Sequence, residues 1–206
     1  MKRRSGIRKT GKTKGLIMKV LHVGCGSKKA GVLPEIYKDY KEVRLDIDEK
    51  VEPDFCCSII DMNLVPSNNY DSIFSCHNLE HLHPFDVVKA IQEFYRVLND
   101  TGFVFIKVPD LQKIAELILS SPSGCMDVAY ESEAGSITPL DMLYGYRPFT
   151  YTNKYMEHKC AFTDVTLASL LKELGFNQVI TRRNGFDVEV IATKTEQNIN
   201  SILVKI

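Results

Sequence analysis

Two short segments of this 206-residue sequence contain residues that could carry chemistry, and both follow apolar runs directly. In "MKVLHVGCGSKKAG" two glycines flank a cysteine at residues 24–26, and such a turn lets a ligand approach the backbone closely. In "SCHNLEH" the side chains of His77, Glu80 and His81 lie within five residues of one another. Imidazoles and carboxylates either transfer protons near neutral pH or bind metal ions. The first segment therefore indicates a cofactor turn, and the second a reactive or metal-binding group.

Carboxylates follow two further apolar runs. Asp46 in "VRLDID" comes 22 residues after Gly24, where a carboxylate can accept hydrogen bonds from both hydroxyls of a ribose. Asp48 is the alternative residue for that contact. Asp61 in "SIIDMN" is placed to accept a hydrogen bond from an adenine amino group, with the backbone and side chain of Met62 beside the ring. In the alternative interpretation, Asp46 and Asp61 only close the turns that follow their strands.

The elements that must position these residues are predicted from hydrophobic periodicity. Apolar runs alternate with amphipathic segments from residue 18 onward, which is typical of a mostly parallel sheet covered by helices. Because parallel strands end at one edge of such a sheet, the residues named above should meet there. Strands are predicted near 18–23, 42–47, 54–60, 70–76, 102–108, 177–183 and 186–194. Helices are predicted at 85–98, 110–120 and 164–174, the last capped by Asp164.

One long segment does not fit this alternation. Residues 121–160 are rich in Pro, Gly, Ser and Tyr and lack a clean period. Long irregular segments inside compact domains are often functional covers. We therefore expect an insertion over the active site.

Two phosphate-binding motifs are present only in part. "GIRKTGKT" at residues 6–13 matches the P-loop pattern, but that loop must join a buried strand to a helix, and only "MKRRS" precedes it. The turn at 24–26 lacks the third glycine of a dinucleotide fingerprint, because Lys29 stands in its place. The turn therefore suits a ligand that lies close to the backbone but has no pyrophosphate to be bound there.

The charge of the chain is unevenly distributed. Net charge is zero, yet residues 1–15 hold seven Lys or Arg, and the remainder holds 19 basic and 26 acidic residues. We expect residues 1–17 to form a disordered basic tail and residues 18–206 to form one domain. The domain itself has no basic stripe, which argues against a large nucleic-acid surface. An RNA-binding role for the tail is the alternative, because cationic tails attract phosphates.

Cysteine usage and hydropathy indicate the cellular compartment and the solubility of the protein. The six cysteines form no C-x-x-C pair, the N-terminus has no secretory signal pattern, and no apolar run is long enough to span a bilayer. We expect free thiols in a soluble, cytoplasmic protein.

Several motifs, taken in order, resemble those of class I S-adenosylmethionine-dependent methyltransferases, particularly the large bacterial group with an "LEHL"-type motif after the fourth strand. "HVGCG" is similar to the family's glycine motif, "RLDID" to its ribose-binding acid and "IIDMN" to its adenine-side acid. "FYRVLNDTGFVFIKVPD" resembles its helix and fifth strand, and "HKCAFTDVTLASLLKELGF" an element before the last two strands. The resemblance covers Met18 to Lys194, and His22 departs from it, because many members have an acid there.

The resemblance implies a three-layer, Rossmann-like α/β fold with a mostly parallel seven-stranded sheet whose last strand is antiparallel. It also implies S-adenosylmethionine as the cofactor, with the turn at 24–26 along its methionine part. His77, the first residue beyond the fourth strand, should lie near the reactive methyl group. The implied cofactor-binding residues are Gly24, Cys25, Gly26, Asp46, Ile47, Asp61, Met62 and His77.

The histidine segment is open to several interpretations. "HNLEH" fits H-x-x-E-H, the inverted zincin motif of zinc-dependent hydrolases, with His158 as a third ligand. Some small-RNA 3′-end methyltransferases resemble it too, using a Glu/His cluster to hold a metal at the reacting hydroxyl. In the simplest interpretation Glu80 and His81 form hydrogen bonds that fix the turn and the helix start. We expect that simplest case, with no bound metal.

The sequence thus predicts a methyltransferase that acts by in-line displacement. The sulfonium already activates the methyl group, so the protein mainly supplies alignment and excludes water. If the acceptor is a hydroxyl, His77 or His158 is the candidate catalytic base. A small polar or sugar-like acceptor suits the aromatic and polar segment "LYGYRPFTYTNKYMEHK". A zinc hydrolase, an RNA methyltransferase and a non-catalytic nucleotide-binding module are the alternatives.

Overall fold

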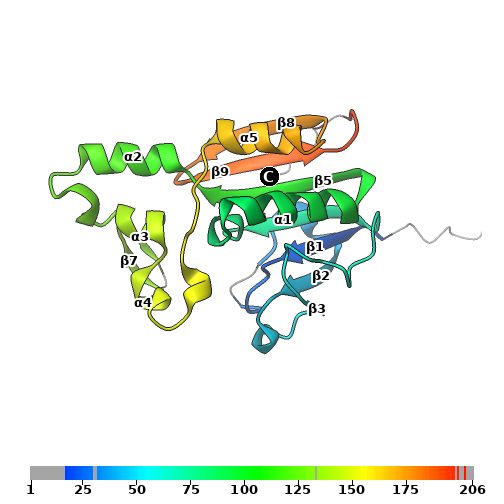
Figure 1. Cartoon of the computed structure of the whole chain (residues 1–206), viewed down its shortest axis with the longest axis horizontal. Coiled ribbons are helices and arrows are strands. Elements are labelled where there is room, and N and C mark those ends of the chain that lie inside the picture. The colour runs from blue at the N-terminus through cyan, green and yellow to red at the C-terminus, as the bar shows by residue number, and fades with distance from the viewer. Residues whose placement is uncertain (1–16, 30–31, 133, 198, 200–201, 203–206) are drawn as a thin grey trace, which may run out of the picture.

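The computed structural model describes residues 17–29, 32–132, 134–197, 199 and 202. Apart from Ile17, the predicted basic tail lies outside the described residues. Among these residues, seven strands form one sheet in the order β3-β2-β1-β4-β5-β9-β8, and β9 runs antiparallel to the other six (Figure 1). The predicted fold class is therefore confirmed, including the antiparallel last strand.

The elements follow the predicted order closely. The strands of the large sheet are β1 (Lys19–Val23), β2 (Lys41–Asp46), β3 (Phe55–Cys56), β4 (Tyr70–Cys76), β5 (Leu98–Pro109), β8 (Gln178–Asn184) and β9 (Asp187–Thr193). The α-helices are α1 (Pro84–Val97), α2 (Leu111–Ser120), α3 (Pro139–Tyr144), α4 (Arg147–Thr150) and α5 (Asp164–Glu173). A small hairpin consists of β6 (Tyr130–Ser132) and β7 (Gly135–Ile137). Short 3-10 turns are η1 (Glu35–Tyr37), η2 (Glu49–Val51), η3 (Leu79–His81), η4 (Gly124–Met126) and η5 (Lys154–Met156).

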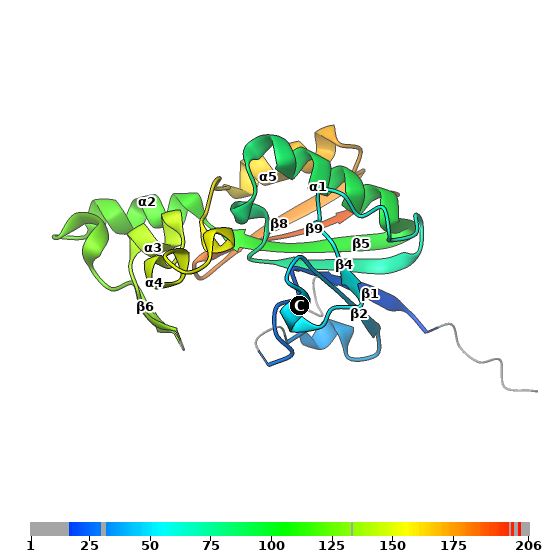
Figure 2. The ribbon, with the colours of Figure 1, turned by 60° about the horizontal axis from the view of Figure 1, so that its bottom comes forward.

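The two faces of the sheet are covered differently. Helices α1 and α5 lie over one face and bury the main core, in which Ile91, Phe94 and Leu167 are fully buried (Figure 2). Tyr37 and Ile199 contribute to the smaller cluster on the opposite face. Alternation along each strand supplies both clusters, because successive side chains point to opposite faces.

The third strand is much shorter than predicted. The apolar run suggested a strand over 54–60, but β3 contains only Phe55–Cys56. The reason is Ser58, whose hydroxyl accepts a hydrogen bond from the backbone N–H of Ile60, while its carbonyl accepts one from Asp61. Such a local side-chain bond turns the chain out of the sheet.

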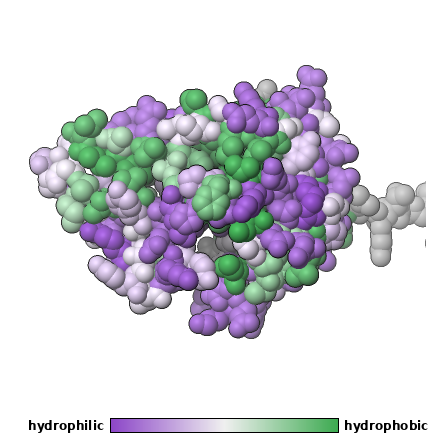
Figure 3. Space-filling view, viewed as in Figure 1, coloured by the Kyte–Doolittle hydropathy of each residue, from purple (hydrophilic) through white to green (hydrophobic). Residues whose placement is uncertain are grey.

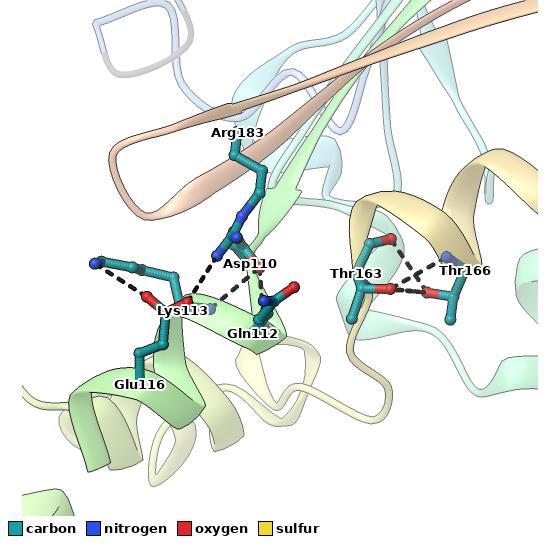
Figure 4. Close-up of polar contacts among 7 residues, drawn as sticks. All are labelled: Asp110, Gln112, Lys113, Glu116, Thr163, Thr166 and Arg183. Atoms are coloured by element: carbon teal, nitrogen blue, oxygen red, sulfur yellow. Dashed lines mark hydrogen bonds and ion pairs between the residues drawn. The ribbon is translucent and has the colours of Figure 1, made fainter. Parts of the chain in front are cut away.

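The cap of α5 also differs from the prediction by one residue. Thr163, not Asp164, is the N-cap, and its hydroxyl accepts a hydrogen bond from the N–H of Thr166. The hydroxyl of Thr166 in turn accepts one from the N–H of Thr163, which completes a capping box. Figure 4 shows this reciprocal pair. Asp164 therefore occupies the first helical position, where its charge favours the helix dipole.

The segment predicted as an insertion forms a lobe beyond the ends of β5 and β9 (Figure 1). It contains the hairpin, α3 and α4, and with α2 it has its own apolar cluster around Ile114, Ile137 and Met142. Hydrophobic side chains gather on the surface of the lobe over α2 (Figure 3). Residues 121–160 are thus more regular than their composition indicated.

Asp110 attaches this lobe to the sheet. Its side chain is buried and accepts hydrogen bonds from the N–H groups of Gln112 and Lys113, which caps α2. The guanidinium of Arg183 on β8 donates to the same carboxylate (Figure 4). The N–H of Asp110 also donates to Phe186 O. One carboxylate therefore holds the start of the lobe against the last two strands.

In the part of the chain that the structure describes, no helix combines the length and hydropathy needed to cross a bilayer.

Candidate functional site

The predicted site residues converge at the carboxyl edge of the parallel strands. The sheet register pairs Val23 on β1 with Leu45 on one side and with Ser75 on the other. The residues that follow these positions, Gly24 and Asp46, therefore leave the sheet side by side. This is the edge at which open α/β sheets bind ligands.

The glycine turn has a backbone shape that other residues resist. Gly24 and Gly26 have φ values of +60° and +56°, in the left-handed region. A Cβ at Gly24 would lie 2.4 Å from the side-chain nitrogen of Asn78, whereas a Cβ at Gly26 would have no described atom within 4 Å. The buried amide nitrogen of Asn78 has no hydrogen-bond partner among the described residues. The turn thus offers open space at Gly26 and an unpaired donor beside Gly24.

Asp46 and Cys25 hold this turn in place. One carboxylate oxygen of Asp46 accepts a hydrogen bond from Gly26 N–H at 2.8 Å, and the other accepts one from Asp48 N–H at 3.0 Å. Each oxygen keeps a further lone pair for a ligand hydroxyl. Cys25 donates its N–H to Leu45 O, and burial raises the pKa of its thiol to about 11. The thiol of Cys25 is therefore neutral and packed inward.

His22 is buried beneath the turn. Its Nδ1 lies 2.8 Å from Glu42 Oε1, and Arg44 Nη1 lies 3.3 Å from the same oxygen. Arg44 also donates to Gly26 O at 2.6 Å. Burial lowers the pKa of His22 despite the neighbouring carboxylate. Many members of the resembled family have an acid at this position. In this chain the position holds a buried histidine that contacts Glu42 on the neighbouring strand β2.

The remaining cofactor residues predicted from the sequence differ in accessibility. Ile47 is half-exposed directly after Asp46, and Asp61 is exposed in the turn that follows β3. Met62 is fully buried in the main core, its N–H donates to Glu93, and its carbonyl accepts from Arg96. A side chain packed in the core cannot lie beside an adenine ring. Met62 therefore does not fit the role predicted for it.

His77 lies between two carboxylates at the end of β4. Its φ of +48° is in the left-handed region, and its Nδ1 and Nε2 lie 3.2 Å from Glu80 Oε1 and 3.5 Å from Asp187 Oδ1. The His77 side chain is 47% exposed; partial desolvation would lower its pKa, but the two carboxylates outweigh that effect and raise the pKa above 6.5. This arrangement favours the protonated form of His77. Both ring nitrogens face acids, so the geometry does not favour it as a general base.

Glu80 bonds to His77 within the turn, as predicted, but Glu80 and His81 do not fix the start of α1, so that part of the prediction is wrong. Helix α1 begins at Pro84 after an N-cap without a side-chain hydrogen bond. The carbonyl of Glu80 instead accepts the N–H of Lys159 at 2.7 Å, and His81 Nδ1 lies 3.1 Å from Glu157 O. These contacts join η3 to the end of the lobe.

The geometry also excludes the inverted zincin motif. That motif needs His77 and His81 on one face of a helix. His77 has a positive φ, and His81 ends the three-residue turn η3. The H-x-x-E-H arrangement on which the zinc hydrolase alternative rested is therefore not formed.

His158 lies beside His81, with ring centroids 4.8 Å apart. Its Nδ1 lies 2.9 Å from Met142 O, and burial lowers the pKa of its imidazole. Because a carbonyl only accepts hydrogen bonds, Nδ1 of His158 carries the proton. His158 is thus a neutral imidazole whose Nε2 has a free lone pair.

A cleft of about 280 Å³ separates the sheet edge from the lobe. Its walls combine histidines, aromatic rings, the buried Asp141 and the partly buried Asp187, and the stacked rings of Tyr130 and Phe186 lie 5.2 Å apart. The lining includes residues that the sequence did not single out, because their positions depend on how the lobe folds. Those residues are Tyr130, Asp141, Met142, Phe186 and Asp187, whereas Tyr146 lies in the segment predicted to suit the acceptor.

Comparisons with known proteins agree with this geometry. Residues 3–181 match the family model described as a methyltransferase domain. A SAM-dependent methyltransferase from Archaeoglobus fulgidus is similar at a TM-score of 0.54 and 17% identity, covering 85% of this chain and 86% of that one. Burkholderia thailandensis 1,6-didemethyltoxoflavin-N1-methyltransferase, solved with S-adenosylhomocysteine, is similar at a TM-score of 0.53 and 15% identity, covering 87% and 72%. A possible histamine N-methyltransferase from Thermotoga maritima is similar at a TM-score of 0.53 and 12% identity, covering 86% and 82%. Among curated proteins no match is found.

Proposed function

This chain belongs to the methyltransferase domain family, and we propose that it transfers the methyl group of S-adenosylmethionine to a small polar acceptor. The family predicted from the motifs is thereby confirmed. The observation that carries the proposal is the position of the cleft, which opens at the same sheet edge as the glycine turn and Asp46. Cofactor and acceptor sites that share one edge suit direct transfer between two bound molecules.

The residues at the sheet edge fit S-adenosylmethionine. The lone pairs that remain on Asp46 suit the two ribose hydroxyls, and the half-exposed Ile47 is placed to cover the adenine. The unpaired amide nitrogen of Asn78 offers a donor to the carboxylate of the methionine part. Asp61 remains a proposed partner of the adenine amino group. When bound, S-adenosylmethionine supplies a methyl group that its sulfonium already activates.

The size and chemistry of the cleft support a small polar acceptor. A volume of about 280 Å³ is at the lower end of ligand pockets, which suits a molecule of monosaccharide size. Stacked aromatic rings such as Tyr130 and Phe186 suit the apolar face of a sugar, and the acids and imidazoles suit its hydroxyls. Outside residues 1–15 the net charge is minus seven, which disfavours a nucleic-acid acceptor.

His77 and His158 have different parts in this proposal. His77, charged and held by Glu80 and Asp187, fixes the shape of the cleft rather than removing a proton. His158 presents the lone pair of Nε2, which can accept a hydrogen bond from the acceptor hydroxyl. Alignment of the acceptor against the methyl group supplies the remainder of catalysis.

Calorimetry with S-adenosylhomocysteine tests the cofactor half of the proposal. We expect one site per chain for the product and for S-adenosylmethionine, and no comparable binding of NAD or ATP. Binding of NAD or ATP instead would show a different nucleotide site. A panel of radiolabelled methyl-transfer assays on free sugars, hydroxy acids and amines then tests the acceptor class. Methylation of RNA alone would favour the alternative in which the basic segment at residues 1–15 recruits a nucleic acid.

The state of the cysteines is relevant to the cellular location of the enzyme. Within the described residues all six are free thiols, and Cys56 is exposed. Exposed free thiols persist in reducing compartments. We therefore propose a cytoplasmic location.

A further inference from the structure

Three residues that could ligate a metal meet where the lobe contacts η3. Each of Glu80, His81 and His158 offers one ligand atom, and these atoms all lie within 4.8 Å of one another. Ligands of tetrahedral zinc, each about 2.1 Å from the ion, lie roughly 3.4 Å apart. Side-chain shifts of about 1 Å therefore bring this set to bonding distance. His81 and His158 also line the cleft, so an ion bound here would face the acceptor site.

Glu80 has an oxygen without a partner at this position. The side chain is 1% exposed, and its Oε1 lies 3.2 Å from His77 Nδ1. Its Oε2 is buried and has no hydrogen-bond partner among the described residues. A buried carboxylate oxygen without a donor is costly, and such atoms in native proteins are explained by an ion, a water or a catalytic role. The unpaired Oε2 of Glu80 thus indicates a position for one further partner, in addition to His77 on Oε1.

Both histidines are oriented as metal ligands are. His81 Nδ1 lies 3.1 Å from Glu157 O, and His158 Nδ1 lies 2.9 Å from Met142 O. A carbonyl can only accept, so each Nδ1 donates its proton to it, and in the neutral tautomer that this bond selects the ligand atom is Nε2. Metal-bound histidines typically donate their other ring N–H to a backbone carbonyl in this way, which fixes the tautomer and the ring.

We propose that Glu80, His81 and His158 bind one divalent transition-metal ion, with zinc as the best match, and that its open position faces the acceptor. Two imidazoles and one carboxylate form the ligand set of catalytic zinc sites, which keep a fourth position for water or substrate. Imidazole-rich sites favour zinc and its neighbours over magnesium or calcium. This assignment replaces the sequence-based expectation of no metal.

The role of the ion in catalysis rests on the proposed function. Its substrate class is an acceptor that carries a hydroxyl, because a bound ion lowers the pKa of a coordinated hydroxyl. The acceptor oxygen forms a bond to the methyl carbon, and the electron pair of the breaking C–S bond stays on sulfur, which becomes a neutral thioether. The hydroxyl proton leaves to solvent water. With the ion in place, the Nε2 lone pair of His158 is a ligand rather than a proton acceptor.

Metal binding is measured on the full-length protein after dialysis against EDTA. We expect calorimetric titration with Zn²⁺ to show one equivalent bound, and Co²⁺ to give the visible absorption of a low-coordinate site. His81→Asn and His158→Asn should each weaken Zn²⁺ binding at least 100-fold, as should the near-isosteric Glu80→Gln. His83→Asn is the matched control, because His83 is exposed and lies outside the cluster. Circular dichroism and the melting temperature confirm that each variant is folded.

The outcomes separate this proposal from the proposed function. Binding of S-adenosylhomocysteine without any Zn²⁺ or Co²⁺ site overturns the metal site and leaves the methyltransferase intact. Zn²⁺ binding that the three ligand variants do not weaken, or that His83→Asn removes, also overturns it. One equivalent of Zn²⁺ that depends on Glu80, His81 and His158 supports it, even if no methyl acceptor is found.

Discussion

The side-chain amide of Asn78 lies so close to Gly24 that a Cβ at residue 24 would come within 2.4 Å of its nitrogen. Asn78 follows β4 and Gly24 follows β1, so this contact joins the ends of two adjacent parallel strands. The glycine is therefore required for close packing as well as for its positive φ. The two requirements can be measured separately, because Gly26 shares the backbone conformation but not the contact.

Gly24→Ala should destabilise the protein more than Gly26→Ala. Each substitution places a side chain in the left-handed region at a cost of about 1 kcal/mol. Only Gly24→Ala also meets the Asn78 amide, and such overpacking typically adds about 1–3 kcal/mol. Free energies of unfolding from urea titration measure the difference.

A double-mutant cycle isolates the contact. Adding Asn78→Ala to Gly24→Ala should recover most of the overpacking cost, whereas adding it to Gly26→Ala should not. Equal costs for the two glycine variants would show that the Asn78 contact is not restrictive.

Asp46→Ala should weaken cofactor binding by ~1–3 kcal/mol, because the ribose loses charge-assisted hydrogen bonds and the Gly26 N–H loses its acceptor. Calorimetry with S-adenosylhomocysteine measures the change. Asp48→Ala is the matched control, because Asp48 is an exposed acid two residues away that caps η2. Unchanged affinity in a folded Asp46→Ala variant would remove Asp46 from the cofactor site, and a loss seen only in Asp48→Ala would assign the ribose contact to Asp48.

Hydrophobic periodicity predicted the strands and a mostly parallel sheet, and the family resemblance added the antiparallel last strand, but the ends of the elements were predicted less well. The strand 70–76 and the helix over 85–98 were predicted to within one residue, because long apolar patterns define them. The end of β3 depends instead on the Ser58 hydroxyl, and the cap of α5 on the choice between neighbouring Thr163 and Asp164. Single hydrogen bonds decide such boundaries, and their geometry is not visible in periodicity.

Site residues that directly follow a predicted strand could be placed from the sequence, whereas those in the lobe could not. Gly24, Asp46 and His77 follow strands, so the order of the strands places them at one edge. Many of the cleft residues come from the lobe, whose fold depends on contacts such as Arg183 with Asp110 that link distant segments. The role predicted for Met62 assumed that β3 extends to residue 60, so that Met62 would follow the strand at the sheet edge. The strand ends at Cys56, and the Met62 side chain packs in the core.

Thr163→Ala should lower the free energy of unfolding by about 1 kcal/mol, since it removes the oxygen that caps α5. Asp164→Asn removes only a charge in the first turn and should cost about 0.5 kcal/mol or less. Urea titration of both variants separates the two roles. A larger loss in Asp164→Asn than in Thr163→Ala would restore Asp164 as the cap.

Asp141 should make the lobe sensitive to acid. Burial would raise its pKa, but Arg147 and the Thr138 hydrogen bonds lower it from 3.8 to about 2. A carboxylate whose pKa is depressed in the folded state stabilises the fold above its unfolded pKa, and the stabilisation is lost as pH falls toward the folded pKa. The shift corresponds to about 2 kcal/mol.

The stability difference between the wild type and Asp141→Asn should therefore shrink as pH falls from 5 to 2. Thermal unfolding across this range measures it, provided that the transition stays reversible. Asp39→Asn is the control for the general effect of replacing an acid, because Asp39 is exposed and lies outside the lobe. A difference that is constant for Asp141→Asn would show that the Arg147 pair does not depress the pKa.

Ala134→Trp should block the acceptor without affecting the cofactor. Ala134 is exposed at the tip of the β6–β7 hairpin and lines the cleft, so a large side chain can fill the cleft without disrupting a core. We expect the KM for the acceptor to rise at least 10-fold while the Kd for S-adenosylhomocysteine stays within twofold. Glu131→Trp on the same hairpin is the control, because Glu131 is exposed and does not line the cleft. A parallel loss of cofactor affinity in Ala134→Trp would mean that the cleft holds the cofactor, and an unchanged KM would place the acceptor elsewhere.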